Sequence, residues 1–292
     1  MYMEHHNISE EYVSLDAGMR LVCAVTDGVA SRSESEIHPH MDFIEIYRFV
    51  DGVDTFAYEG QRIAVTSGMI IAVCDNVLHR PLTRENSHYE RQRLLIKKEV
   101  FSRYDTPTME LYARLRKRQI LVLSPSDGGQ RGAAFFDGIR ELLLCKTVYD
   151  DYCALIRTLH LLIEMEADGA SSKEELMLVG EGEGARILAY INEHLDEDLT
   201  YRHIAERFFL SEGSVYQLFR REIGFPLAQY VATRRIMRAT AVLNAGGSAT
   251  EAAAAAGFLE YSVFYRTFLR HVGMSPKAYI KSLSGRKYER FV

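Results

Sequence analysis

Two histidines and a glutamate lie close together in the first fifth of the chain and could form a binding site. His38, His40 and Glu45 follow the spacing H-x-H-x4-E, and His79 comes eleven residues after Gly68. Three imidazoles and one carboxylate suit a first-row divalent metal. The same residues could instead line a metal-free pocket for a small molecule, which is the interpretation we favour, or they could be structural histidines.

Two arginines continue this candidate site further along the chain. Arg91 and Arg93 lie in the apolar run 89–96, where they could meet an anionic or hydroxylated effector or simply face solvent. We expect no cofactor. The predicted effector-binding residues are therefore His38, His40, Glu45, His79, Arg91 and Arg93.

Short strands must position these side chains. Between about residue 15 and residue 96, β-branched and aromatic runs alternate with turn signals about every eight residues, which predicts an antiparallel barrel or sandwich. The clearest runs are 43–50, 55–58, 62–66, 69–74 and 89–96.

Beyond Lys97 the pattern becomes helical. One apolar stripe contains Phe135, Ile139, Leu142 and Leu143, and a second contains Leu155, Ile156, Leu159, Leu162 and Ile163. Such spacing gives each helix one apolar face. Two faces exceed what is needed to cover one side of a barrel, so we predict a homodimer through these helices.

Composition and charge divide the chain into two parts. Residues 167–184 are rich in Gly, Ser and Glu and are predicted to be a linker between a domain at 1–166 and a domain at 185–292. The net charge is −5, but residues 185–292 carry 15 Lys/Arg against 10 Asp/Glu. A basic C-terminal part favours contact with nucleic acid. No signal peptide or membrane helix is evident, and the four scattered cysteines are interpreted as reduced core thiols of a cytoplasmic protein.

The C-terminal part contains an internal repeat. Residues 216–230 match residues 265–279 at a shift of 49, with Tyr, Phe, Arg, Gly and Tyr at corresponding positions. In each copy a short helix, a tight turn and a second helix with a polar outer face form a helix-turn-helix pattern. We expect helix caps at Thr200, Ser211 and the capping box Ser248–Glu251, and a burying face that includes Val263.

A long helix over 227–243 separates the two copies. It is expected to hold both units at a fixed separation, with Arg234, Arg235 and Arg238 on its exposed side. Solvated arginines are the simplest interpretation, but phosphate contact is favoured for a fold of this kind. The predicted phosphate contacts are Arg220, Arg221, Arg234, Arg235, Arg238 and Arg270.

The segments 232–243, 256–258, 268–273, 275–276 and Tyr279 resemble the signature of the AraC/XylS family of transcription regulators. The resemblance covers about 100 residues and implies base contacts on both second helices. Arg266 could pair with guanine and Gln217 with adenine, whereas Tyr216 and Tyr265 could equally pack against the helix base. The implied base-contacting residues are Gly213, Tyr216, Gln217, Tyr261, Ser262, Tyr265 and Arg266.

The histidine motifs in turn resemble the two sequence motifs of the cupin barrel. The expected fold class is therefore α+β, with an N-terminal cupin-like antiparallel β-barrel, a helical dimerisation segment and an all-α domain of two helix-turn-helix units. The resemblance implies a regulator that binds double-stranded DNA, a small-molecule effector that could be a sugar, a second copy of itself and RNA polymerase. The alternative is a cupin metalloenzyme fused to a DNA-binding region.

Overall fold

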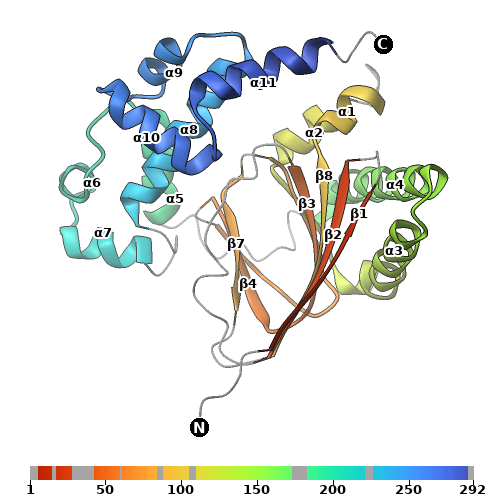
Figure 1. The fold of residues 1–292 in the computed structure, drawn as a ribbon. Helices are drawn as coiled ribbons and strands as arrows, with labels where there is room; N and C mark the ends of the chain where they lie inside the picture. The colour runs from red at the N-terminus through yellow and green to blue at the C-terminus, as the bar shows by residue number, and fades with distance from the viewer. Residues whose placement is uncertain are drawn as a thin grey trace. The chain divides into compact units, whose positions relative to one another are not determined.

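The fold is that of a computed structural model of the full chain, coloured from one terminus to the other in Figure 1. The structure describes residues 6–14, 18–27, 43–59, 61–75, 77–83, 88–104, 110–172, 183–220 and 226–288. The predicted sites His38, His40 and Arg221 lie outside the described residues. Within these ranges no helix combines the length and apolar character needed to cross a membrane.

The chain divides into two compact units. One consists of residues 1–58 and 62–179, and the other of residues 180–292 with residues 59–61. The elements of the first unit are β1 (His6–Val13), β2 (Met19–Asp27), β3 (Phe43–Asp51), β4 (Val53–Tyr58), β5 (Gln61–Ala64), β6 (Ile70–Val73), β7 (His79–Thr83), β8 (Tyr89–Lys97), α1 (Glu99–Tyr104), α2 (Leu111–Arg118), β9 (Ile120–Leu123), α3 (Pro125–Cys145) and α4 (Val148–Ser172).

The strands of the first unit form two antiparallel sheets and not the closed barrel that we expected. Six strands follow the order β1-β2-β8-β3-β6-β9, and three follow the order β5-β4-β7. Among the described strands, no hydrogen-bonded pairing joins the two sheets into a ring. The expected closed barrel is therefore corrected to a pair of sheets, each with its own edges.

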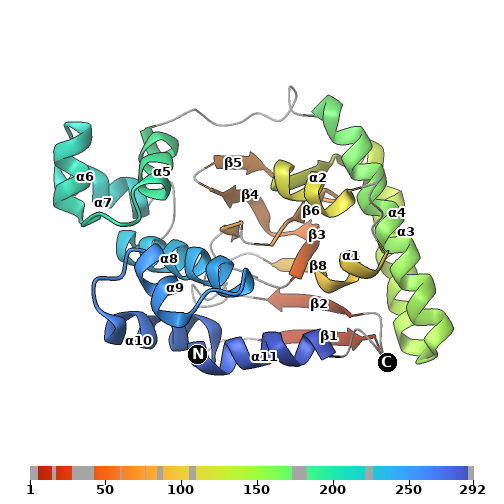
Figure 2. The ribbon, with the colours of Figure 1, turned by 90° about the horizontal axis from the view of Figure 1, so that it is seen from above.

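Strand β3 is buried on both of its faces. Tyr47 and Phe49 point toward the smaller sheet, where their rings lie 5.7 and 5.8 Å from the ring of Phe56 on β4. Successive side chains alternate between faces, so Ile44 and Ile46 point the other way. That opposite face is covered by α3 and α4, which Figures 1 and 2 show side by side. Strand β3 therefore packs on both faces and lies between β8 and β6 within the larger sheet.

Two strands were not expected from the sequence. Strand β1 is polar, and β9 lies beyond Lys97 in a stretch predicted to be helical. β9 is only four residues long and pairs with β6 at the sheet edge, with Leu121 opposite Ala72. A short apolar run of this kind cannot be told from part of a helix by periodicity alone.

The cysteine prediction was wrong at two positions. Cys74 is a buried thiol, as expected, but Cys145 and Cys153 are exposed at the end of α3 and on α4. Both lie in apolar helical stretches whose outward faces also carry apolar residues. Apolar neighbours in the sequence therefore did not imply burial here.

Helix α4 is longer than expected from the sequence. It continues to Ser172, six residues into the predicted linker.

The second unit is entirely helical in its described part. Its elements are α5 (Glu183–Glu193), α6 (Tyr201–Phe208), α7 (Glu212–Leu218), α8 (Leu227–Asn244), α9 (Ala249–Ala255), α10 (Tyr261–Val272) and α11 (Pro276–Tyr288). Helices α6 and α7 form one pair and α9 and α10 another, and α8 runs between the pairs (Figure 2).

The predicted helix caps are confirmed. The hydroxyl oxygens of Thr200 and Ser211 accept hydrogen bonds from the backbone N–H groups of His203 and Ser214, at 3.2 and 3.0 Å. Ser248 and Glu251 form a complete capping box, with the Ser248 N–H donating to Glu251 Oε2 at 2.7 Å. This backbone hydrogen bond lowers the pKa of the Glu251 carboxyl.

The turns of the two helix pairs differ in one residue. Phe209 and Gly257 both adopt left-handed backbone conformations, with φ of 56° and 78°. They are 48 residues apart, whereas the following N-caps, Ser211 and Glu260, are 49 apart. The additional residue is Leu259, which is 99% exposed. The shift of 49 found in the sequence therefore holds for the second helices and becomes 48 for the first.

Glycine is required in the second turn only. A Cβ on Gly257 would lie 2.2 Å from the Leu195 carbonyl oxygen, which cannot move away as a flexible side chain could. Phe209 faces open solvent instead and is 94% exposed, so its side chain meets nothing although its backbone is strained. The second turn is thus packed against the segment that follows α5.

We predict that Gly257→Ala lowers the free energy of unfolding by about 3 kcal/mol, because the substitution adds a clash to an unfavourable backbone conformation. Gly246→Ala is the matched control, since Gly246 has φ of 94° but nothing within 4 Å of a new Cβ. Gly246→Ala should lower the free energy of unfolding by only about 1 kcal/mol. Urea unfolding followed by circular dichroism measures both, and equal losses would contradict the packing argument.

Candidate functional site

The second helix of the first pair, α7, presents a polar face to solvent. Gly213, Tyr216 and Gln217 are exposed, as expected for base-contacting positions. Val215 and Phe219 are fully buried on the opposite side and fix how the helix lies. A Cβ on Gly213 would meet only Ser211 Oγ at 3.7 Å, so nothing in the fold requires glycine there.

Tyr216 has features of both roles that the sequence left open, contact with a base and packing against a neighbouring helix. Its ring lies 5.8 Å from the ring of Tyr201 at the start of α6, yet the residue is 47% exposed. The contact orients the ring without covering it. A tyrosine held in this way can present its hydroxyl to a partner.

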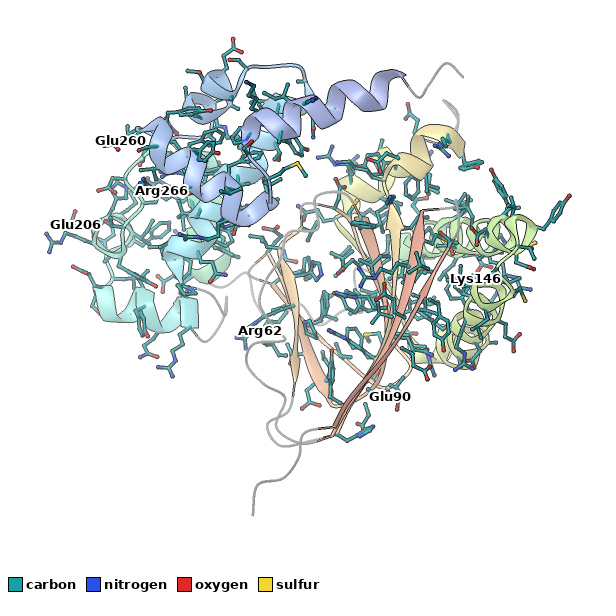
Figure 3. All side chains as sticks on the ribbon, viewed as in Figure 1. Arg62, Glu90, Lys146, Glu206, Glu260 and Arg266 are labelled. Carbon is teal, nitrogen blue, oxygen red and sulfur yellow. The ribbon has the colours of Figure 1, made fainter. Side chains whose placement is uncertain are left out.

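The second helix of the second pair, α10, repeats this arrangement. Phe264 and Phe268 are fully buried, while Tyr261, Ser262, Tyr265 and Arg266 are exposed. Figure 3 labels Arg266 on this helix and Glu260 at its N-cap position.

Val263 was expected in the core but is 40% exposed. Phe264 and Phe268 are four residues apart and already occupy the inward stripe, and Val263 lies beside that stripe.

The arginines predicted to contact phosphate fall into two groups. Arg220, Arg238 and Arg270 are exposed. Arg234 and Arg235 were expected on the exposed side of α8, but both are partly buried. Arg234 Nε donates to Asn192 Oδ1 at 2.6 Å, so its guanidinium has a partner in α5.

Arg235 joins α8 to the segment after α5. Its Nε donates to the Leu195 carbonyl and one terminal nitrogen to the Glu197 carbonyl, each at 2.8 Å. The ring of Phe258, from the second turn, lies 5.7 Å from its guanidinium carbon. Burial lowers the pKa of Arg235 from its usual value. This arginine therefore satisfies carbonyl groups that follow a helix end.

A second cluster of functional side chains lies between the two sheets of the first unit. Glu45 on β3 and His79 on β7 are buried, with Glu45 Oε2 and His79 Nε2 2.9 Å apart. Arg93 on β8 places a terminal nitrogen 3.4 Å from Glu45 Oε1. The Tyr47 hydroxyl donates to Glu45 Oε2 and lies 3.3 Å from His79 Nε2.

Hydrogen-bond geometry fixes where protons lie in this cluster. His79 Nδ1 lies 2.8 Å from the Val77 carbonyl, which can only accept, so Nδ1 carries a proton. Burial, together with the charge of Glu45, raises the pKa of Tyr47 well above its usual value, so Tyr47 remains a donor.

Strand register explains which predicted effector residues meet. Tyr47 is paired with Arg93 and Phe49 with Arg91 in the antiparallel β3–β8 ladder, so both arginines stand on the inward face of β8. Arg91 lies over the ring of Tyr89, 5.3 Å from its centroid. Among the described residues, Arg93 Nε is buried without a hydrogen-bond partner.

The possible metal site has no support within the described residues. No group of three or more His, Cys, Asp or Glu side chains comes together there. Of the four residues considered, only Glu45 and His79 are described, and they contact each other directly.

Sequence reasoning missed Tyr47, although it lies two residues after Glu45 on the same face of β3. The alternation of side chains along a strand could have identified it.

The C-terminal unit matches a known domain family. Residues 204–282 match the family described as "Helix-turn-helix domain", which covers α7 to α10 and parts of α6 and α11. This segment is therefore a helix-turn-helix domain.

Curated relatives extend this likeness. The melibiose operon regulatory protein of Escherichia coli K12 is 34% identical over 108 residues, which are 37% of this chain and 35% of that protein. The transcriptional activator RhaR of Cronobacter sakazakii is 30% identical over 34% of this chain and 36% of its own length. The chain thus spans about a third of the length of these relatives. The activator RhaS of E. coli O81 is 23% identical over 82% of this chain and 85% of its own length.

Two solved structures are similar to this chain over part or most of its length. The DNA-binding domain of AdpA in complex with a target DNA is 29% identical over 35% of this chain and 93% of its own, with a TM-score of 0.33. ToxT from Vibrio cholerae O395 is 12% identical over 91% of this chain and 99% of its own, with a TM-score of 0.37. TM-scores this low do not establish that either structure has the same fold as this chain.

We predict that Arg235→Ala lowers the free energy of unfolding by about 2–3 kcal/mol, because it removes two charge-assisted hydrogen bonds and takes away the arginine donor of the Leu195 carbonyl, whereas the Glu197 carbonyl keeps the Leu199 N–H. Arg238→Ala, on the same helix but exposed, should change it by no more than about 0.5 kcal/mol. Both values come from denaturant unfolding of the full chain. Similar small losses would show that Arg235 has no structural role.

Proposed function

We propose that this chain is a transcription regulator of the AraC/XylS type, which binds double-stranded DNA through α7 and α10 and senses a small molecule through its N-terminal unit. The observation that supports it most strongly is the repeated arrangement of the second unit. Two helix pairs, capped at Thr200 and Ser211 in the first and at Ser248 in the second, each expose a second helix, and the match to the helix-turn-helix family covers both second helices. The curated relatives are named as regulators, which favours regulation over catalysis.

The two readers would enter the DNA separately. Helix α8 has 18 residues and is about 27 Å long at about 1.5 Å per residue. Successive major-groove faces on one side of a duplex are about 34 Å apart. With α8 between them, α7 and α10 would read two short base clusters about one helical turn apart.

Specific contacts would come from the exposed residues near the start of each second helix. Gln217 would pair with adenine and Arg266 with guanine, with Gly213, Tyr216, Tyr261, Ser262 and Tyr265 completing the surface. Exposed Arg220, Arg238 and Arg270 would contact phosphates, and Arg221 remains a prediction. Arg234 and Arg235 already have partners within their own unit, so we assign them a positioning role.

The effector would bind beside the cluster of Glu45, His79 and Arg93. A carboxylate, an imidazole and a guanidinium on the walls of an aromatic interior suit a small hydroxylated molecule, and sugars are the first class to test. The matched segments of the melibiose and RhaR relatives are confined to about a third of this chain, so their names do not identify this effector. RNA polymerase contact belongs to the same proposal.

The homodimer would form along α4. Tyr149, Tyr152, Ile156 and Ile163 are exposed and follow the 3.5-residue spacing of a coiled-coil seam. The sequence stripe that suggested this interface included Leu155 and Leu162, but both are buried in the core of the first unit. The proposed seam is therefore the adjacent face of the same helix.

We predict that Ile156→Glu converts a dimer into a monomer, because it places a charge at the centre of the seam, where Ile156 is 64% exposed. Leu259→Glu is the matched control, since Leu259 is exposed but lies in the second helix-turn-helix turn. Sedimentation velocity at micromolar concentration distinguishes the species. A monomeric wild-type chain would contradict the proposed interface.

The DNA interface is tested by comparing two arginines on α10. On a duplex selected by the wild-type chain, Arg266→Ala should weaken binding by about 1–3 kcal/mol and leave a scrambled duplex unaffected. Arg270→Ala, one turn later, should weaken both duplexes similarly and reduce the salt dependence by about one phosphate. The measurement is a titration at several salt concentrations. Equal weakening of both duplexes by Arg266→Ala would reject its role as a base reader.

A further inference from the structure

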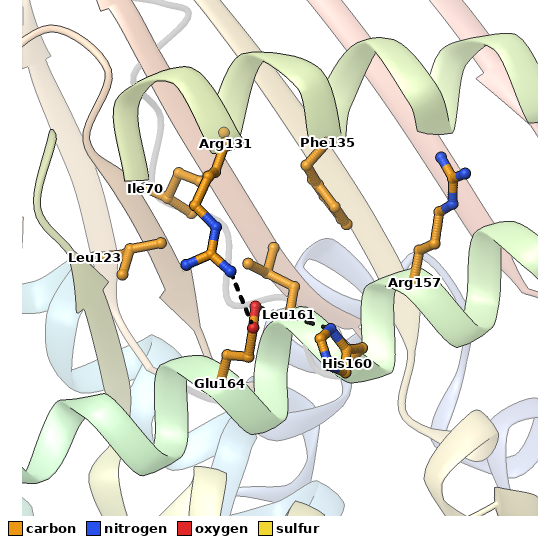
Figure 4. A pocket seen from close by; sticks show the side chains of 9 residues that line it. Ile70, Leu123, Arg131, Phe135, Arg157, His160, Leu161 and Glu164 are labelled. Carbon is orange, nitrogen blue, oxygen red and sulfur yellow. Dashed lines mark hydrogen bonds and ion pairs between the residues drawn. The ribbon is translucent and has the colours of Figure 1, made fainter. Parts of the chain in front are cut away.

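A pocket of about 160 Å³ lies between α3, α4 and the β6–β9 edge of the larger sheet (Figure 4). It lies on the helix-covered side of that sheet, whereas the Glu45 cluster faces the smaller sheet. The apolar residues that line it are Ile70, Leu123, Phe135 and Leu161.

The rim of this pocket carries more positive than negative side chains. Two arginines, Arg131 and Arg157, line it together with one acidic residue, Glu164, and with His160. Glu164 is already shared, at 3.3 Å from Arg131 and 3.8 Å from His160. Among the described residues, Arg157 has no ion-pair partner. Figure 4 shows these side chains along the gap between the two helices.

Gly132 of α3 lines the pocket, and Gly138 of the same helix lies beside the guanidinium of Arg157. A Cβ on Gly138 would lie 2.6 Å from a terminal nitrogen of Arg157, so the absence of a side chain provides the space that this guanidinium occupies. A Cβ on Gly132 would lie 2.8 Å from Ile70 Cδ1, so α3 can approach the apolar floor closely. Glycine destabilises the interior of a helix, but here the two glycines leave space for the Arg157 guanidinium and for the Ile70 side chain.

We propose that this pocket binds a small apolar carboxylate, with the carboxylate at Arg157 and the apolar part on Phe135 and Leu161. An engineered cavity of about 150 Å³ accommodates benzene, which indicates one ring or a short branched chain as the apolar part. Guanidinium groups pair well with carboxylates, and an apolar floor below a cationic rim selects an amphipathic anion. The site is separate from the proposed effector cluster and does not depend on DNA binding.

Sodium benzoate is the probe for this site, and benzyl alcohol is the uncharged molecule of the same size. In thermal unfolding of the full chain, about 10 mM benzoate should raise the Tm of the first unit by about 3 °C. Benzyl alcohol and sodium chloride at matched ionic strength should not. Equal shifts with benzoate and benzyl alcohol would overturn the requirement for a carboxylate.

Variants locate the site within the molecule. Arg157→Ala and Arg157→Gln, which keeps a longer but uncharged side chain, should both abolish the rise in Tm caused by benzoate. Arg140→Ala, also on this helix pair, is the matched control and should keep the shift, because Arg140 pairs with Asp137 outside the pocket. A shift that survives in both Arg157 variants would overturn the proposal. Since the readout is an unfolding temperature, failure to bind DNA would leave this result unaffected.

Discussion

The contact between Arg235 and the segment after α5 connects helix α8 to the start of the second unit. One guanidinium on α8 binds two backbone carbonyls of that segment, and the turn containing Gly257 packs against the same residues. Helix α8 therefore joins the segment that leads into the first helix pair to the turn of the second. This region therefore adds to the apolar core between α8, α9 and α10 in fixing how the two helix pairs are held, and a Cβ at Gly257 would clash with the Leu195 carbonyl there.

The first unit depends on a different arrangement, in which a polar cluster is enclosed by aromatic rings. The rings of Phe56 and His79 stack with centroids 5.6 Å apart, and Tyr47 stacks on Phe49 at 5.5 Å. Buried carboxylates are stable only with hydrogen-bond partners, and Glu45 has them from three different strands. Of these three partners, Tyr47 and Arg93 lie in the same sheet as Glu45 and His79 lies in the smaller one, so a molecule that displaced His79 from Glu45 would alter the connection between the sheets.

Local patterns in the sequence predicted local structure well. The caps at Thr200, Ser211 and Ser248 and the exposed faces of α7 and α10 follow from residue types at fixed spacing. What could not be predicted depends on contacts between distant segments. Arg235 looks like any exposed helix arginine until Leu195 and Glu197 are brought beside it. Closure of a barrel likewise depends on strand pairing across the fold, which the alternation of residues does not encode.

The extra residue in the second turn has a consequence for protein engineering. Because Leu259 has no counterpart in the first turn, the two helix pairs cannot be superimposed with one numerical offset along their whole length. A designer who exchanged α7 and α10 with the offset of the first helices would misplace each helix by one residue, which rotates every side chain by about 100° around the helix axis. The residues of α7 and α10 must therefore be aligned from the N-caps Ser211 and Glu260.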